Sequence, residues 1–82
     1  MIQVGQTYRY TDGSGYHDVV FVVVEEGMGS PRPLGGQNVS GYFAIILDGA
    51  LNGGWPKKSG DIFFFTKGSH ISSNIVRFPE ER

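Results

Sequence analysis

Three segments of the chain are apolar at consecutive positions, where a half-exposed strand would alternate between apolar and polar residues. They read VVFVVV (19–24), FAIIL (43–47) and, within DIFFFT, IFFF (62–65). Successive side chains of a strand point to opposite faces, so each segment carries apolar groups on both faces. The pattern therefore predicts strands with the core on one face and a second covered surface on the other.

Five strands are predicted by short β-branched and aromatic runs, each bounded by glycine, proline, asparagine, aspartate or serine. They cover Gln6–Thr11, His17–Glu26, Gly41–Asp48, Asp61–Thr66 and Asn74–Phe78. The turn DGSG predicts a hairpin between the first two. The two longest connections, 27–41 and 48–61, are rich in glycine and polar residues and are typical of loops.

This layout resembles that of SH3-like small barrels, which have five short strands and a turn of helix between the last two. The segment ISSNIVRF (71–78) resembles the end of SH3 domains, where a Ser-Asn pair leaves a 3₁₀ turn and a valine begins the final strand. TYRYTD (7–12) resembles their aromatic and acidic opening. The resemblance implies that residues 1–82 form a single all-β, five-stranded barrel with a 3₁₀ turn before the last strand.

The chain departs from SH3 domains at the positions that bind ligand. Gly41-Tyr42-Phe43 stands where domains that bind proline-rich peptides carry a tryptophan pair, and DGSGYHD replaces their acidic loop. The resemblance thus implies a fold and no ligand. Short glycine-rich chains that open with VGQTYRY also resemble small bacteriophage proteins, which implies a host factor that the protein would block as an inhibitor.

The size of the chain and its lack of cysteine limit the ways in which the fold can be stabilised. A chain of 82 residues buries a small core and commonly needs a disulfide, a metal or oligomerisation. With no cysteine, disulfides, thiolate zinc sites and cysteine catalysis are excluded. No targeting segment or membrane-spanning run is visible in the sequence, so we expect a cytoplasmic protein of a bacterial cell or an infected host cell.

Two interpretations of the second apolar surface stay open. A strongly coiled small barrel lets a long strand bury different faces along its length, which suits 17–26 better than 61–66. Alternatively, a second sheet from another copy or from a different protein covers the surface, and each aromatic side chain buried there would contribute about 1.5–3 kcal/mol. We predict a homo-oligomer with an interface that includes Phe63, Phe65, Val20 and Val22.

Charge narrows the class of partner. A formal net charge of −1 argues against nucleic acid, although residues 1–26 are mainly acidic and residues 55–78 mainly basic. The run GGWPKK sets Trp55 beside Lys57 and Lys58, a combination that can stack a base and hold a phosphate. Arg32 lies between two prolines in the other long loop.

These patterns support three hypotheses of function. The first is a non-enzymatic module that self-associates and binds a protein partner through its long loops, with Trp55, Tyr42, Arg32 and Lys57 as anchors, because aromatic and arginine side chains dominate interfaces. The second is a binder of a small anionic ligand or nucleotide at a subunit interface, where Lys58 also contributes. The third, binding of single-stranded nucleic acid, fits the net charge least.

Candidate catalytic and metal-binding residues lack the required spacing. Ser69 and His70 are adjacent in a turn, which points their side chains apart, and no Gly-x-Ser-x-Gly motif is present. DGALNGG lacks the ligand spacing of a calcium loop, and Glu25 and Glu26 would face opposite sides of a strand. We therefore expect no enzyme activity, no cofactor and no metal.

Overall fold

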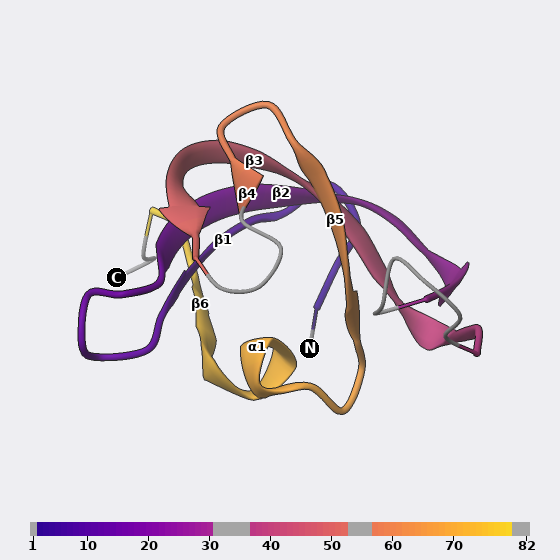
Figure 1. The fold of residues 1–82 in the computed structure, drawn as a ribbon. Coiled ribbons are helices and arrows are strands. Elements are labelled where there is room, and N and C mark those ends of the chain that lie inside the picture. Colours follow the sequence, from indigo (N-terminus) through magenta and orange to yellow (C-terminus); the bar gives the residue numbers. More distant parts are fainter. Residues whose placement is uncertain (1, 31–36, 53–56, 80–82) are drawn as a thin grey trace.

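The computed structural model describes residues 2–30, 37–52 and 57–79 of the chain. Within these ranges the backbone forms six strands and one short helix (Figure 1). They are β1 (Thr7–Thr11), β2 (Asp18–Gly29), β3 (Val39–Leu51), β4 (Lys57–Lys58), β5 (Ile62–Thr66), α1 (His70–Asn74) and β6 (Ile75–Arg77). Five of the strands match the predicted ones, while β4 lies in a segment predicted to be loop.

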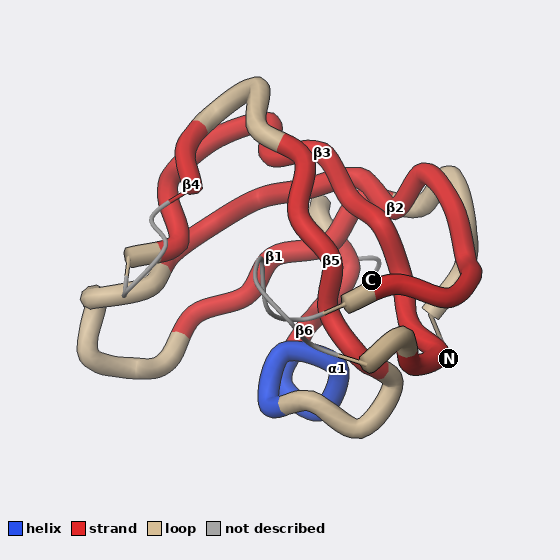
Figure 2. The backbone as a smooth tube through the Cα atoms, turned by 45° about the vertical axis from the view of Figure 1, so that its right-hand side comes forward, coloured by secondary structure: helices blue, strands red, loops and turns tan. Residues whose placement is uncertain are grey.

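The strands form one antiparallel sheet in the order β4-β3-β2-β1-β6, and β5 also pairs with β3. β2 and β3 arch across the molecule, while α1 lies below the arch and connects β5 to β6 (Figures 1 and 2). The predicted all-β class is confirmed. The expected closed, five-stranded barrel is not, because the pairing of the described strands leaves an open six-stranded sheet.

Two irregularities bend the long β2–β3 pair. The pairing register shifts between Val20 and Phe21 and again between Val23 and Glu25. Such bulges bend a strand and increase its twist. Near the first shift Gly49 has a φ of 75°, and a Cβ atom there would collide with the Asp18 carbonyl oxygen, so glycine is required. The coiling gives the sheet a concave inner face and an outer face.

The core lies on the inner face and is built mainly from aromatic and β-branched side chains. Phe21 on β2 is fully buried and lies at the centre of the core. Its ring makes edge-to-face contacts with Phe63 and Phe65, whose ring centroids lie 5.2 Å and 5.6 Å from its own. Ile71 of α1 packs against the same cluster. The buried members are Tyr8, Tyr10, Val19, Phe21, Val23, Tyr42, Ala44, Ile46, Phe63 and Phe65.

Phe63 and Phe65, which were expected at an oligomer interface, lie in the core of the single chain. Both side chains are buried, at 8% and 3% exposed. Their partners are Phe21 and each other, because alternation along β5 turns both toward the concave side. The phenylalanine that faces outward is Phe64.

The turn of helix before the last strand is α-helical and not the expected 3₁₀ turn. α1 spans only His70–Asn74, and the hydroxyl oxygen of its N-cap Ser69 accepts a hydrogen bond from the Ser72 backbone N–H. The Ser72 hydroxyl in turn donates to the Thr66 carbonyl oxygen at 2.6 Å. These bonds fix the turn that returns the chain from β5 to β6, which then pairs with β1.

Candidate functional site

The outer face of the sheet carries an apolar surface, which we call the outer apolar face. Residues directly opposite each other on paired strands lie on the same side of a sheet, so the register and the alternation along each strand define its members. They come from four strands and the segment that follows β6. The members are Val20, Val22, Val24, Phe43, Ile45, Leu47, Ile62, Phe64, Val76 and Phe78. The apolar side chains are contiguous across β2, β3 and β5, while Thr7 and Arg9 of β1 separate them from β6.

The middle of this face is a row of three aliphatic side chains. Val22 on β2 opposes Ile45 on β3, and Ile45 opposes Ile62 on β5. Cross-strand neighbours of this kind have Cβ atoms about 4.5–5.5 Å apart, so the three side chains form one strip across the sheet. Ile62 at the end of the strip is 55% exposed.

An aromatic pair continues the face toward the far end of β2 and β3. The rings of Phe43 and Phe64 lie 4.9 Å apart, and the two residues oppose each other on β3 and β5. Both rings cover glycines: a Cβ atom on Gly29 would lie 2.8 Å from Phe64 and 2.9 Å from Phe43, and one on Gly41 would lie 2.6 Å from Phe64. The glycines thus leave room for the two rings, which pack against the backbone there.

Much of the outer apolar face is open to solvent. Five of its ten members are between 40% and 55% exposed: Val24, Leu47, Ile62, Val76 and Phe78. Single exposed apolar side chains are common on proteins, but a contiguous apolar surface of several hundred Å² usually marks a site of interaction. The contiguity across β2, β3 and β5 makes the face the strongest candidate site in the described part of the chain.

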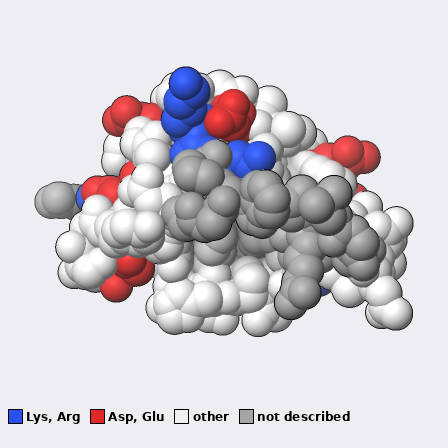
Figure 3. Space-filling model, in the orientation of Figure 1, with Lys and Arg blue, Asp and Glu red and all other residues white. Residues whose placement is uncertain are grey.

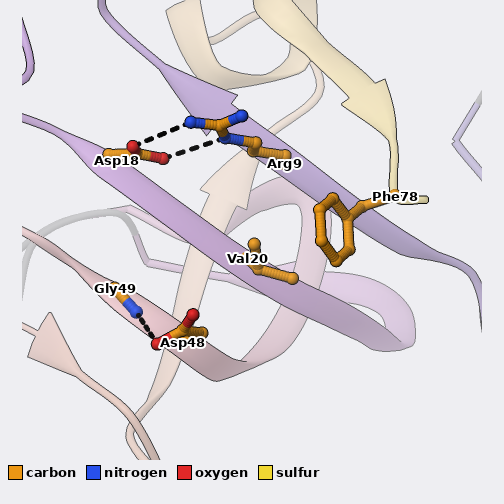
Figure 4. A pocket seen from close by; sticks show the side chains of 6 residues that line it. All are labelled: Arg9, Asp18, Val20, Asp48, Gly49 and Phe78. Carbon is orange, nitrogen blue, oxygen red and sulfur yellow. Dashed lines mark hydrogen bonds and ion pairs between the residues drawn. The ribbon is translucent and has the colours of Figure 1, made fainter. Parts of the chain in front are cut away.

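A shallow hollow of about 220 Å³ lies at one end of the face (Figure 4). Arg9 on β1 donates two hydrogen bonds to Asp18 on β2, from Nε at 3.0 Å and from Nη2 at 2.9 Å. This hydrogen bonding and the positive charge of Arg9 hold the pKa of Asp18 below its usual value. The remaining lining residues are Val20, Asp48, Gly49 and Phe78.

The structure separates the residues that were expected to form a binding site on the loops. Tyr42, expected as a loop anchor, lies on β3 and is buried in the core at 8% exposed, where its ring packs on Phe65 and its centroid lies 5.7 Å from the Lys67 ammonium group. Lys57 and Lys58 form β4 beside the end of β3. Trp55 and Arg32 lie outside the described residues.

Charged side chains also lie on the outer surface, and two of them are neighbours of Val20, namely Arg9 on β1 and Asp48 on β3. By the register, Lys58, Ala50 and Asp18 lie side by side on the outer surface at the end that holds the hollow. Glu25, which opposes Phe43, lies toward the other end. In Figure 3 the basic side chains gather near the top of the view, with acidic ones beside and to either side of them.

The histidines and acidic residues form no evident reactive centre in the described segments. The search over residues 2–30, 37–52 and 57–79 finds no group of three histidine, cysteine, aspartate or glutamate side chains that could hold a metal ion. His17 instead links two loops, because its Nδ1 accepts a hydrogen bond of 3.0 Å from the Asn52 backbone N–H. Ser69 caps α1, as described above.

Of the predicted interface residues, Val20 and Val22 lie on the outer apolar face and are half-buried. Their role in an oligomer stays a prediction. The pattern analysis missed Phe43, Ile45, Ile62 and Phe64. Only the pairing register shows that these residues lie on the same face of the sheet as Val22, because both faces of all three strands are equally apolar in the sequence.

Comparison of the chain with models of protein families, with curated proteins and with solved structures found no match. None of the helices in the described ranges has the length and apolar character needed to span a membrane. What the structure establishes is a small all-β domain built on an antiparallel sheet.

Proposed function

We propose that the protein is a non-enzymatic interaction module that binds another protein chain through the outer apolar face. The observation that carries this proposal is the unbroken strip Val22–Ile45–Ile62 next to the Phe43–Phe64 pair, which crosses three strands and is partly open to solvent. Covering such side chains contributes about 25 cal/mol per Å² of apolar surface. This differs from the loop-centred hypothesis, since the anchors now lie on strands.

The proposal includes an SH3-like arrangement of the strands. Its support is the pairing: β1, β2, β3 and β5 are joined in succession, and the turn at α1 returns β6 to the free edge of β1. The departures at Gly41 and Tyr42 argue against proline-rich peptides as ligands, because Tyr42 is buried in this sheet. A rigid sheet face then takes the place of a peptide groove.

Binding of a small anionic ligand gains no support from the hollow. Its lining includes the carboxylates of Asp18 and Asp48 against the single guanidinium of Arg9, which is already paired with Asp18. An anion placed there would meet a net negative charge. Lys57 and Lys58 are the described residues of the basic run, and neither lines the hollow.

Site-specific photo-crosslinking in cells tests the proposed function. A photoreactive amino acid placed at Leu47 or Ile62, which are 50% and 55% exposed on the outer apolar face, should give discrete protein adducts that mass spectrometry identifies. Met28 is a matched control, because it is 60% exposed and opposes Ser40 outside the face. If Leu47 and Ile62 gave no adduct beyond that of Met28, the face would not be a protein-binding surface.

A further inference from the structure

We infer that the occupant of the outer apolar face is a second copy of this chain, packed face to face about a two-fold axis over the Val22–Ile45–Ile62 strip. This inference rests on the proposed function, because it names the partner of the same surface. Two sheets that pack in this way form one apolar layer between them, about 10 Å thick. Each chain thereby gains a second core that its own short sequence cannot supply.

The available area is that of a weak dimer. A large aromatic side chain offers roughly 150–250 Å² and an aliphatic one somewhat less, so the partly exposed members on β2, β3 and β5 present on the order of 450 Å² per copy. Two copies would bury about 900 Å², which is less than specific interfaces of standard size bury and is typical of weak, transient association. We therefore expect the dimer to form only at high concentrations of the chain.

The charges of the described residues favour a like partner. The central strip and the Phe43–Phe64 pair carry no charged side chain themselves. Glu25 lies beside Phe43, so a copy must pack over the strip and leave that carboxylate in solvent. At the end with the hollow, Arg9 and Lys58 balance Asp18 and Asp48. The formal net charge of the whole chain is −1, so two copies repel each other little.

The shape of the face is set before any partner arrives. Phe43 and Phe64 press on each other and on Gly29 and Gly41, which restricts both rings without a second chain. A surface that is already ordered loses little conformational entropy on association. In a two-fold interface both copies contribute the same surface, so each contact between two residues occurs twice.

Sedimentation equilibrium of the purified full chain over a wide concentration range tests the inference. We expect the wild type to associate to a dimer by mass action. Ile62→Lys should raise the dimer dissociation constant at least about tenfold, since both copies place a charge in the apolar layer. Met28→Lys adds the same charge at a site of similar exposure outside the face and should leave the constant unchanged.

A cysteine cross-linking experiment gives an independent readout if Ile62→Lys does not fold. The chain has no cysteine, so Ile62→Cys carries a single thiol and a short bis-maleimide can join only two chains. Efficient dimer cross-linking of Ile62→Cys, with little for Met28→Cys, supports the inference. A wild-type monomer at every concentration, a dimer that Ile62→Lys leaves intact, or equal cross-linking at both positions overturns it.

The outcome also separates this inference from the proposed function. A monomer in sedimentation that still gives a photo-adduct with a different protein at Leu47 or Ile62 would overturn self-association and keep the face as a protein-binding surface. A monomer that gives no adduct at either position would overturn both.

Discussion

At the scale of single residues, the packing of the Phe43–Phe64 pair requires the glycines beneath it as much as the rings themselves. Gly41→Ala would place a methyl group against the Phe65 carbonyl oxygen and 2.6 Å from the Phe64 ring. We expect the free energy of unfolding to fall by about 1–3 kcal/mol, because the backbone pairing of β3 with β5 must shift. Urea denaturation measures the change.

The matched control is Gly68→Ala, since a methyl group there meets no atom within 4 Å. It should leave the stability within about 0.5 kcal/mol of the wild type. Equal losses for the two variants would mean that the rings do not press on the sheet as described.

A second prediction at this scale concerns the Arg9–Asp18 ion pair. The hydrogen bonds from Arg9 lower the pKa of Asp18 from its ordinary value of 3.8. A carboxyl with a lowered pKa in the folded state stabilises the fold above its unfolded pKa, and this stabilisation is lost as the pH falls through the folded pKa. The wild type should therefore have a higher free energy of unfolding than Asp18→Asn, by an amount that is constant above about pH 5 and becomes smaller below pH 3.8.

Denaturation curves of both proteins at several pH values and low ionic strength measure this difference. Added salt should reduce the difference at neutral pH, because the pair is exposed at the surface. A difference that does not change between pH 6 and 2 would show that the ion pair does not link stability to pH.

At the scale of elements, α1 depends on its cap. The helix has five residues, so one capping bond is a large part of its hydrogen bonding, and Ser69 provides it by accepting from the Ser72 N–H. Ser69→Ala should destabilise the protein by about 0.5–2 kcal/mol, whereas Ser69→Asn should retain most of the stability. Thermal denaturation followed by circular dichroism measures both. Equal losses would argue against a capping role.

The strands show which parts of the fold the sequence predicts. Alternation along 62–65 correctly separates Phe64 from its two neighbours, and the β-branched runs locate β2 and β3. The pattern cannot decide which side is the core, because both sides are apolar. That choice follows from pairing between distant segments, which brings Phe63 and Phe65 against Phe21.

Other features escaped prediction for related reasons. Gly29 and Gly41 lie in a run that is typical of loops, yet they extend β2 and β3 beneath the Phe64 ring. Tyr42 has the character of a binding residue but is required to complete the core beside Phe65. β4 is too short for a periodic pattern and exists because Lys57 and Lys58 pair with the end of β3.

At the scale of the whole molecule, folding and association should be coupled. A single chain of this size leaves part of its apolar surface open. The proposed dimer would cover this surface, and a second copy that binds only the folded chain would stabilise the fold more as its concentration rises. The Tm of the wild type should therefore rise with protein concentration. Met28→Lys should keep this dependence, and Ile62→Lys should abolish it.

Differential scanning calorimetry at several protein concentrations measures this coupling. Below the dissociation constant of the dimer, the wild type and Ile62→Lys should melt at similar temperatures, because Ile62 is 55% exposed in the single chain. Above that constant their Tm values should diverge, since only the wild type gains the second apolar layer. A wild-type Tm independent of concentration would mean that the core around Phe21 alone stabilises the chain and that the outer apolar face stays open until a different protein binds.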